Sequence, residues 1–180
     1  MKITSKHKMS DLPKVLFIEK YSEIKLMEEI KKFDVPKEIK GIQVKDNQDI
    51  SIGDMLEIWD ITDQNTLFEL TARVFLDLKL DKIPRLPLID FLRLAEYTNE
   101  TSLMAANLFK SLSRDPKDVR IKDILMKYKG SAFGIIARFC TQFPVYTLEE
   151  AKKLSWVKIY LAFEEKTKEN DIQLEISELK

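Results

Sequence analysis

Glycine is scarce in this chain, with only four among 180 residues, and this scarcity constrains the fold more than any other feature. Average usage in globular proteins is about 7%. Glycine supplies the positive φ angles that tight hairpins and phosphate-binding loops require. We therefore expect a mainly α fold, a helical bundle of about five to seven helices, whose short N-terminal arm has room for one or two β-strands.

The predicted organisation is an N-terminal arm, residues 1–45, followed by a helical domain, residues 46–180, that ends in a long helix. In the arm, Val15–Ile18 is apolar and partly β-branched, which predicts a short strand. Residues 24–33 carry apolar side chains at helical spacing and predict a helix, whereas residues 39–44 predict a second short strand. We expect any β-sheet to lie in this arm.

Capping residues and apolar stripes place the helices of the second part of the chain. Ser51 and Thr66 each precede an acidic residue by three positions, which indicates helix starts, and Thr147 with Glu150 is the clearest capping box. A polar tetrapeptide at 98–101 lies within the predicted helix 88–112 and leaves open whether this helix is divided in two. The helix that ends at residue 143 is apolar nearly all round, which is typical of the centre of a bundle. The predicted helices span residues 52–61, 67–78, 88–112, 116–128, 131–143 and 148–179.

The chain has one histidine, His7, and one cysteine, Cys140, which limits the chemistry available to it. A zinc site of the ordinary type and a histidine-based triad both need more such residues in suitable positions. The aspartates of residues 46–63 do not have the spacing of a calcium-binding EF-hand loop. We therefore expect no catalytic residue, no cofactor and no metal site, and a protein that is not an enzyme.

No apolar run approaches the roughly 18 residues of a membrane span. The lysines near the N-terminus are not followed by the apolar core of a secretory signal. A single cysteine cannot form an internal disulfide. These features favour an intracellular, reducing location without a membrane partner.

Charge is balanced over the whole chain but not along it. Residues 1–40 carry a net charge of +3, residues 41–90 −5, residues 91–146 +4 and residues 147–180 −2. Complementary blocks can pair inside one fold or between copies of it. The sequence leaves both open, so a homo-oligomer is one expectation.

The densest positive segment is 110–129, in which Lys110, Arg114, Arg120 and Lys127 are candidate partner-binding residues. A DNA-reading helix would gather Arg, Asn and Gln on one face, whereas here aspartates are interspersed. We interpret the segment as a solvated or partner-facing surface, and nucleic-acid binding is the alternative.

Trp156 and Tyr160 lie one helical turn apart on the predicted last helix. Aromatic side chains dominate the energetics of protein interfaces, which makes this pair a candidate anchor for a partner. Core packing is the alternative, in which Trp156 fixes the last helix onto the apolar helix at Phe133–Phe143.

Several short motifs are arranged in a distinctive order: Val35–Gly41, Ile50–Leu56, Leu108–Lys110, Lys129–Gly134 and Leu154–Tyr160. Together they resemble a family of small helical proteins of tailed phages that infect Bacteroidetes-type hosts. The resemblance spans most of residues 35–160. Residues 139–146 depart from it, because they lack the Trp-Tyr-Ala-type core expected after the second glycine.

The resemblance implies a virion-assembly role in the tail module, carried out in the host cytoplasm with the virion as the second location. We expect a tail-assembly chaperone that binds apolar helices of a tail partner, so that its partners are other phage structural or tail proteins. One alternative is a permanent structural component of the virion, a connector or packaged protein. The other is a nucleic-acid-binding protein that uses residues 110–129.

Overall fold

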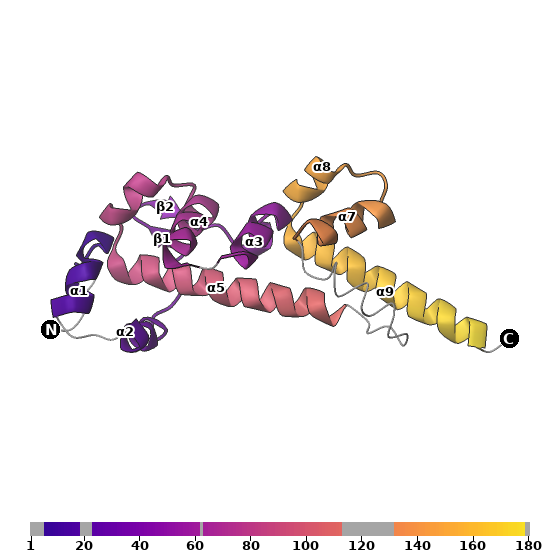
Figure 1. The fold of residues 1–180 in the computed structure, drawn as a ribbon, viewed down its shortest axis with the longest axis horizontal. Helices are drawn as coiled ribbons and strands as arrows, with labels where there is room; N and C mark the ends of the chain where they lie inside the picture. The colour runs from indigo at the N-terminus through magenta and orange to yellow at the C-terminus, as the bar shows by residue number, and fades with distance from the viewer. Residues whose placement is uncertain (1–5, 19–22, 62, 113–131, 179–180) are drawn as a thin grey trace. The chain divides into compact units, whose positions relative to one another are not determined.

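The computed structural model describes residues 6–18, 23–61, 63–112 and 132–178. The described chain is mainly helical and has one two-stranded antiparallel hairpin near its N-terminus (Figure 1). The prediction of a mainly α fold with its sheet confined to the arm is confirmed. The helix predicted over 116–128 lies outside the described residues.

The chain divides into two compact units that interleave along the sequence. Unit 1 comprises Met1–Asn47 with Asp60–Ser102, and unit 2 comprises Gln48–Trp59 with Leu103–Lys180. These units do not follow the predicted boundary at residue 45, because each contains two separate stretches of sequence. The predicted division into an arm and a helical domain stays a prediction. Each unit is described by itself below.

The elements of unit 1 are η1 Met9–Asp11, α1 Leu12–Ile18, α2 Glu23–Ile30, β1 Glu38–Ile39, β2 Ile42–Gln43, α4 Gln64–Leu76, η3 Leu80–Arg85 and the first part of α5 Leu88–Ser111. A short helix, η2 Asn47–Asp49, leads into unit 2. The elements of unit 2 are α3 Ile52–Trp59, the last part of α5, α7 Ala132–Gln142, α8 Leu148–Lys153 and α9 Trp156–Glu178.

The run Val15–Ile18 ends helix α1, so the strand predicted there is wrong. A four-residue apolar run shows no period that separates helix from strand, and Pro13 is compatible with the first turn of a helix. The helix predicted over 24–33 is present as α2, which ends at Ile30. The second predicted strand is a hairpin, because Lys40 and Gly41, with φ of 51° and 80°, form its two-residue turn.

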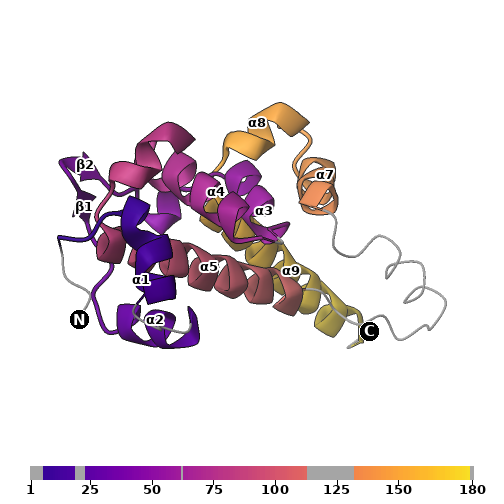
Figure 2. The ribbon, with the colours of Figure 1, turned by 60° about the vertical axis from the view of Figure 1, so that its left-hand side comes forward.

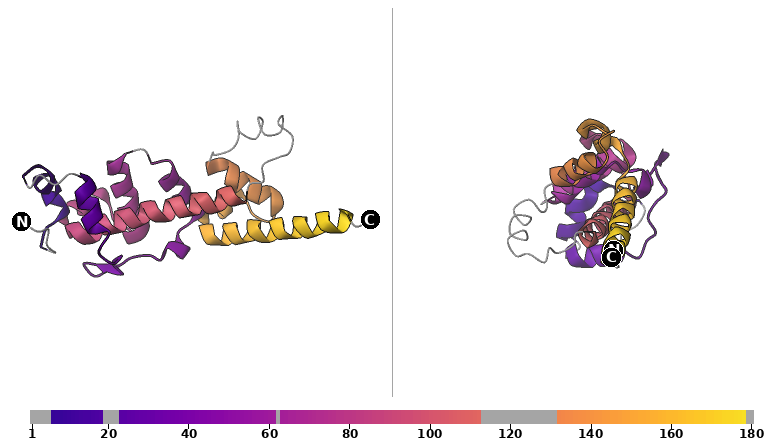
Figure 3. Two further views of the ribbon diagram at one scale, coloured as in Figure 1. Left: turned by 90° about the horizontal axis from the view of Figure 1, so that it is seen from below. Right: turned by 90° about the vertical axis from the view of Figure 1, so that its right-hand side faces the viewer.

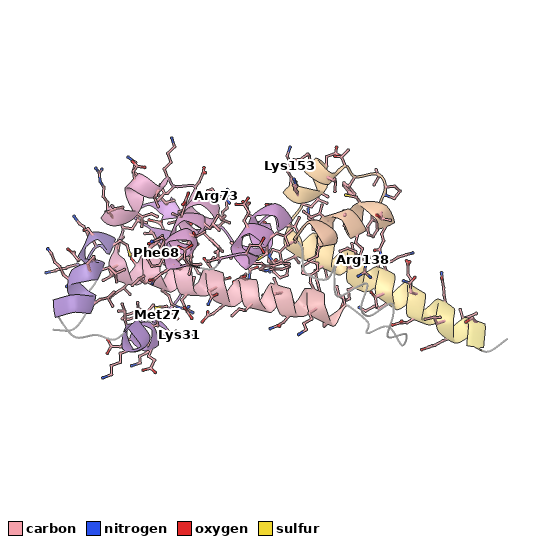
Figure 4. All side chains as sticks on the ribbon, in the orientation of Figure 1. Met27, Lys31, Phe68, Arg73, Arg138 and Lys153 are labelled. Atoms are coloured by element: carbon pink, nitrogen blue, oxygen red, sulfur yellow. The ribbon has the colours of Figure 1, made fainter. Side chains whose placement is uncertain are left out.

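Helix α2 lies beside α5 in unit 1 (Figure 2). Lys31, which follows the last residue of α2, forms an ion pair of 2.8 Å with Glu96 of α5 (Lys31 is labelled in Figure 4). The hydrogen bond and negative charge of Glu96 raise the pKa of Lys31. Arg93 Nε donates to the backbone oxygen of Phe33 over 3.0 Å, so α5 holds both this helix end and the loop after it.

Helix α4 begins at Gln64, two residues before the predicted cap at Thr66. Asp63 is the true N-cap, because its carboxylate accepts hydrogen bonds from the backbone nitrogen and the hydroxyl of Thr66 at 3.0 and 2.6 Å. These bonds lower the pKa of Asp63. The helix ends at Leu76, where Asp77 adopts a left-handed conformation with φ of 53°.

Helix α5 is continuous, and the division considered at 98–101 is wrong. Thr98 Oγ1 donates to the backbone oxygen of Leu94 over 2.9 Å, so its hydroxyl is satisfied inside the helix. Thr98 Oγ1 also accepts a hydrogen bond of 3.2 Å from Thr71 Oγ1 of α4. Both threonines are buried, so a polar contact links α4 and α5 within an apolar core.

We predict that Thr98→Val lowers the free energy of unfolding by about 1 to 3 kcal/mol, because it leaves the buried hydroxyl of Thr71 without its acceptor. The double variant Thr71→Val with Thr98→Val should recover most of this loss, since both polar groups are then replaced by apolar groups of the same shape. Urea unfolding of wild type, of Thr71→Val and Thr98→Val singly, and of the double variant measures the coupling between the two hydroxyls. Additive losses in the double variant would contradict the prediction.

Candidate protein-binding surface

An aromatic cluster forms the core of unit 2. The ring of Phe109, near the end of α5, meets Trp59 of α3 and Tyr160 of α9 edge to face, with centroids 5.6 and 5.8 Å apart. Phe163, one turn beyond Tyr160, lies 6.4 Å from the same ring. Edge-to-face pairs at these separations are favourable, so Phe109 joins three helices of this unit.

A backbone bridge joins the start of α3 to the start of α9. The backbone nitrogen of Ile52 donates to the oxygen of Leu154 over 2.7 Å, and that of Trp156 donates to the oxygen of Ile50 over 3.1 Å. Leu154 is extended, with φ of −69° and ψ of 147°. The single helix predicted over 148–179 is therefore wrong, because the bridge separates α8 from α9.

Gly53 marks the close approach of α3 to α8. A Cβ atom at this position would lie 3.1 Å from the backbone oxygen of Lys152, which is tighter than ordinary packing. Gly134, by comparison, is half-buried in α7.

Helix α7 packs on α3 and α8, but it does not lie at the centre of a bundle as its apolar composition predicted. Ile136 and Phe139 are buried, whereas Arg138 and Thr141 are exposed. The guanidinium of Arg138 lies 5.6 Å from the ring centroid of Phe163 in α9, a cation–π distance (Figure 4). Only one side of α7 therefore contributes to the core.

The segment between α7 and α8 exposes apolar side chains, and we call residues 143–148 the α7–α8 corner. Val145 is 79% exposed, and Tyr146 and Leu148 are each 38% exposed. Contiguous exposed apolar patches, unlike single exposed apolar side chains, mark interaction sites on protein surfaces. The corner is therefore the candidate functional surface of unit 2.

Aromatic packing holds the corner from the α7 side. The buried ring of Phe139 lies 4.9 Å from that of Phe143 and 5.5 Å from that of Tyr146. The backbone nitrogen of Tyr146 donates to the oxygen of Phe143 over 3.1 Å, which closes the turn. Phe139 in turn contacts Phe163 of α9 at 6.0 Å, so the corner is attached to the core.

A capping box holds the corner from the α8 side, as the sequence predicted. The backbone nitrogen of Thr147 donates to Glu150 Oε2 over 2.9 Å, and that of Glu150 donates to Thr147 Oγ1 over 3.3 Å. The hydrogen bonds that the backbone nitrogen and the hydroxyl of Thr147 donate to the Glu150 carboxylate lower the pKa of Glu150. The corner is thus fixed at both ends and needs little reordering to bind a partner.

The residues that the sequence proposed for partner binding lie elsewhere. Trp156 is only 3% exposed, at the start of α9, and Tyr160 is half-buried against Phe109, which favours the core-packing alternative for both. Lys110 is exposed near the end of α5. Arg114, Arg120 and Lys127 lie outside the described residues. A binding role for these six residues stays a prediction.

Sequence reasoning missed the α7–α8 corner. Its signal was the apolar run Phe143-Pro144-Val145-Tyr146, which follows an apolar helix and includes a helix-ending proline. Such a run is equally compatible with a buried turn. The tertiary structure shows which side chains of this run are exposed.

Within the described part of the chain, no three His, Cys, Asp or Glu side chains are grouped so that they could hold a metal ion. Of the helices that the structure describes, none combines the length and the apolar composition of a transmembrane span. No protein family, curated protein or solved structure matches this chain. The resemblance to phage tail-module proteins therefore stays a prediction.

We predict that the capping box makes stability depend on pH. The ionised Glu150 stabilises the folded state above its unfolded pKa, near the ordinary value of 4.5, and this contribution is lost as the pH falls through the lowered folded pKa. Wild type should be more stable than Glu150→Gln at pH 7, and the difference should shrink at pH 3.5. Urea unfolding at both pH values measures it, and a constant difference would contradict the assignment.

Proposed function

We propose that this protein is a non-enzymatic assembly factor that binds an apolar helical surface of another protein through its α7–α8 corner. The observation that carries the proposal is the fixed exposure of Val145, Tyr146 and Leu148 beside a buried aromatic core. A rigid apolar surface binds with a small loss of conformational entropy. Aromatic side chains such as Tyr146 are enriched among residues that dominate binding energy.

The rim of the corner is charged, as is usual for protein interfaces. Lys152 Nζ lies 2.8 Å from Glu149 Oε1 in the first turns of α8, and both side chains are solvent-accessible. Exposed ion pairs contribute little binding energy. Affinity is therefore expected to come from the apolar centre, whereas the charges favour a partner with a polar border.

The resemblance found in the sequence narrows the partner class. It supports a tail-assembly chaperone of a tailed phage that covers apolar helices of a tail protein until assembly. Helix-in-groove contacts of this kind use apolar side chains at helical spacing on the partner. A permanent connector or packaged protein of the virion would use the same surface, and the two roles differ in whether the protein remains in the mature particle.

Nucleic-acid binding through residues 110–129 is the alternative from another class. Lys110 is the member of this basic segment that the structure describes, and it is exposed. Binding through lysine and arginine would weaken steeply with salt, since phosphate contacts release counterions. Absence of binding to DNA and RNA at low salt would eliminate this alternative.

We predict that Val145→Asp and Tyr146→Ala each weaken binding to the cognate tail protein by about tenfold or more, because each removes apolar contact at the centre of the surface. The partner is sought by co-expression with the proteins encoded by neighbouring tail genes, and affinity is measured with the purified pair. Mass spectrometry of purified virions then separates a chaperone, which is absent, from a structural component.

The matched control is Leu80→Asp. Leu80 lies in η3 of unit 1 and is 57% exposed, so it tests the loss of an exposed apolar side chain away from the corner. This variant should bind as wild type does, and all variants should keep the helical circular dichroism of wild type. The proposal fails if no tail protein binds, or if the control weakens binding as much as the corner variants do.

A further inference from the structure

Helix α9 has a second side that faces away from the core of unit 2. Its core side carries Trp156, Ile159 and Phe163, which are 3%, 0% and 7% exposed. On the opposite side, Leu161 and Ile172 are 51% and 57% exposed. The helix is uninterrupted between them, as Figure 3 shows.

We define the α9 outer face by six exposed residues that follow one another at intervals of three and four positions: Lys158, Leu161, Glu165, Lys168, Ile172 and Glu175. This alternation is the spacing of the a and d positions of a heptad repeat. Residues so spaced drift by about 20° per heptad on a straight helix, and a left-handed supercoil removes the drift. The outer face therefore has the geometry of a two-stranded coiled-coil seam.

When the seam is read from its C-terminal end, its apolar and charged residues match those of the same seam read from its N-terminal end. If a second α9 lies antiparallel, with the two-fold axis between Lys166 and Thr167, Leu161 of each copy is opposite Ile172 of the other. Glu165 is then opposite Lys168 at the centre. In antiparallel coiled coils a positions meet d positions, as these pairs require.

The outermost layer of the same register opposes Lys158 to Glu175. Each of the layers thus pairs an apolar residue with an apolar residue or a positive charge with a negative one. We propose that the α9 outer face binds a second copy of this chain in this antiparallel register. The seam from Lys158 to Glu175 spans roughly 27 Å at about 1.5 Å per residue.

Three neighbouring arrangements of two α9 helices bring like charges together. A parallel, in-register pair would oppose Lys158, Glu165 and Lys168 each to itself. Sliding the antiparallel pair by one heptad would oppose Lys158 to Lys168 in one direction, or Glu165 to Glu175 in the other. Like charges directly opposed are unfavourable, so charge favours the proposed antiparallel register over these three arrangements.

Existing contacts on the helix surface do not block this seam. Lys168 Nζ lies 3.3 Å from Glu164 Oε2 in the same helix, with side chains 68% and 36% exposed. Such a pair contributes only a few tenths of a kcal/mol, so Lys168 can turn to Glu165 of the second copy. Charged residues at seam positions lower stability but fix register, and we therefore expect a weak, specific dimer.

Cysteine cross-linking tests the register directly. In a Cys140→Ser background, proteins carrying Leu161→Cys and Ile172→Cys are prepared separately and then mixed under mild oxidation. The proposal predicts a disulfide-linked dimer in the mixture and little in either protein alone. Cross-linking of each protein with itself would indicate a parallel pair, and a mixture that stays monomeric would also overturn the proposal.

Charge exchange tests the source of specificity in the protein without added cysteines. Glu165→Lys should weaken dimerisation by about tenfold or more, as it places like charges in both central layers. Adding Lys168→Glu should restore it to within about threefold. Asn170→Lys, which adds a positive charge to an exposed position outside the seam, is the matched control and should leave dimerisation unchanged.

Sedimentation equilibrium measures all four proteins, wild type included, over a range of concentrations. A wild type that remains monomeric at the highest concentration would overturn the proposal, as would a double exchange that does not recover the dimer. Circular dichroism verifies that each variant keeps its helices. Partner binding at the α7–α8 corner is measured separately, so that failure of one proposal leaves the other standing.

Discussion

Short backbone bridges at the starts of the two long helices are the contacts on which the rest of each unit depends. In unit 1 the backbone nitrogen of Leu88 donates to the oxygen of His7 over 2.8 Å. In unit 2 that of Trp156 donates to Ile50 over 3.1 Å. The first N–H groups of a helix have no partner inside it. Each bridge satisfies one of them with a segment distant in sequence and so fixes where the helix begins.

In unit 2 this constraint explains the candidate surface. The bridge ends α8 at Lys153 and brings α8 against α3, where Gly53 permits the close approach. Because α8 is held against α3, the chain must reverse direction between the end of α7 and the start of α8 within a few residues. The ring of Phe139 packs against that of Phe143 in this turn, whereas the side chain of Val145 is exposed to solvent. Exposure of the corner is thus a consequence of helix placement and not of a polar sequence.

Helix α9 shows how one helix can serve the fold and still present a surface of its own. Its aromatic and apolar residues face Phe109 and Phe139 over the first half, whereas the opposite side carries two apolar positions among four charged ones. The interior of unit 2 needs only one side of the helix. The other side does not contribute to this interior. The order of charged residues along it, which pairs opposite charges in the antiparallel register, is the reason for proposing self-association. The α7–α8 corner carries no such order, which is why its partner is sought among other proteins.

The helical class, the position of the only described sheet and the caps at Ser51 and Thr147 could be predicted from the sequence, because they depend on glycine content and on hydrogen bonds between residues three apart. The sequence did not predict that Val15–Ile18 is helical, that α5 continues past Thr98, or that α8 and α9 separate at Leu154. The separation at Leu154 rests on Ile50, a partner distant in the chain. At Val15–Ile18 and at Thr98 the local sequence was compatible with either outcome. Which apolar residues are exposed was likewise decided only by the tertiary structure, since burial depends on what packs against a side chain and not on the side chain alone.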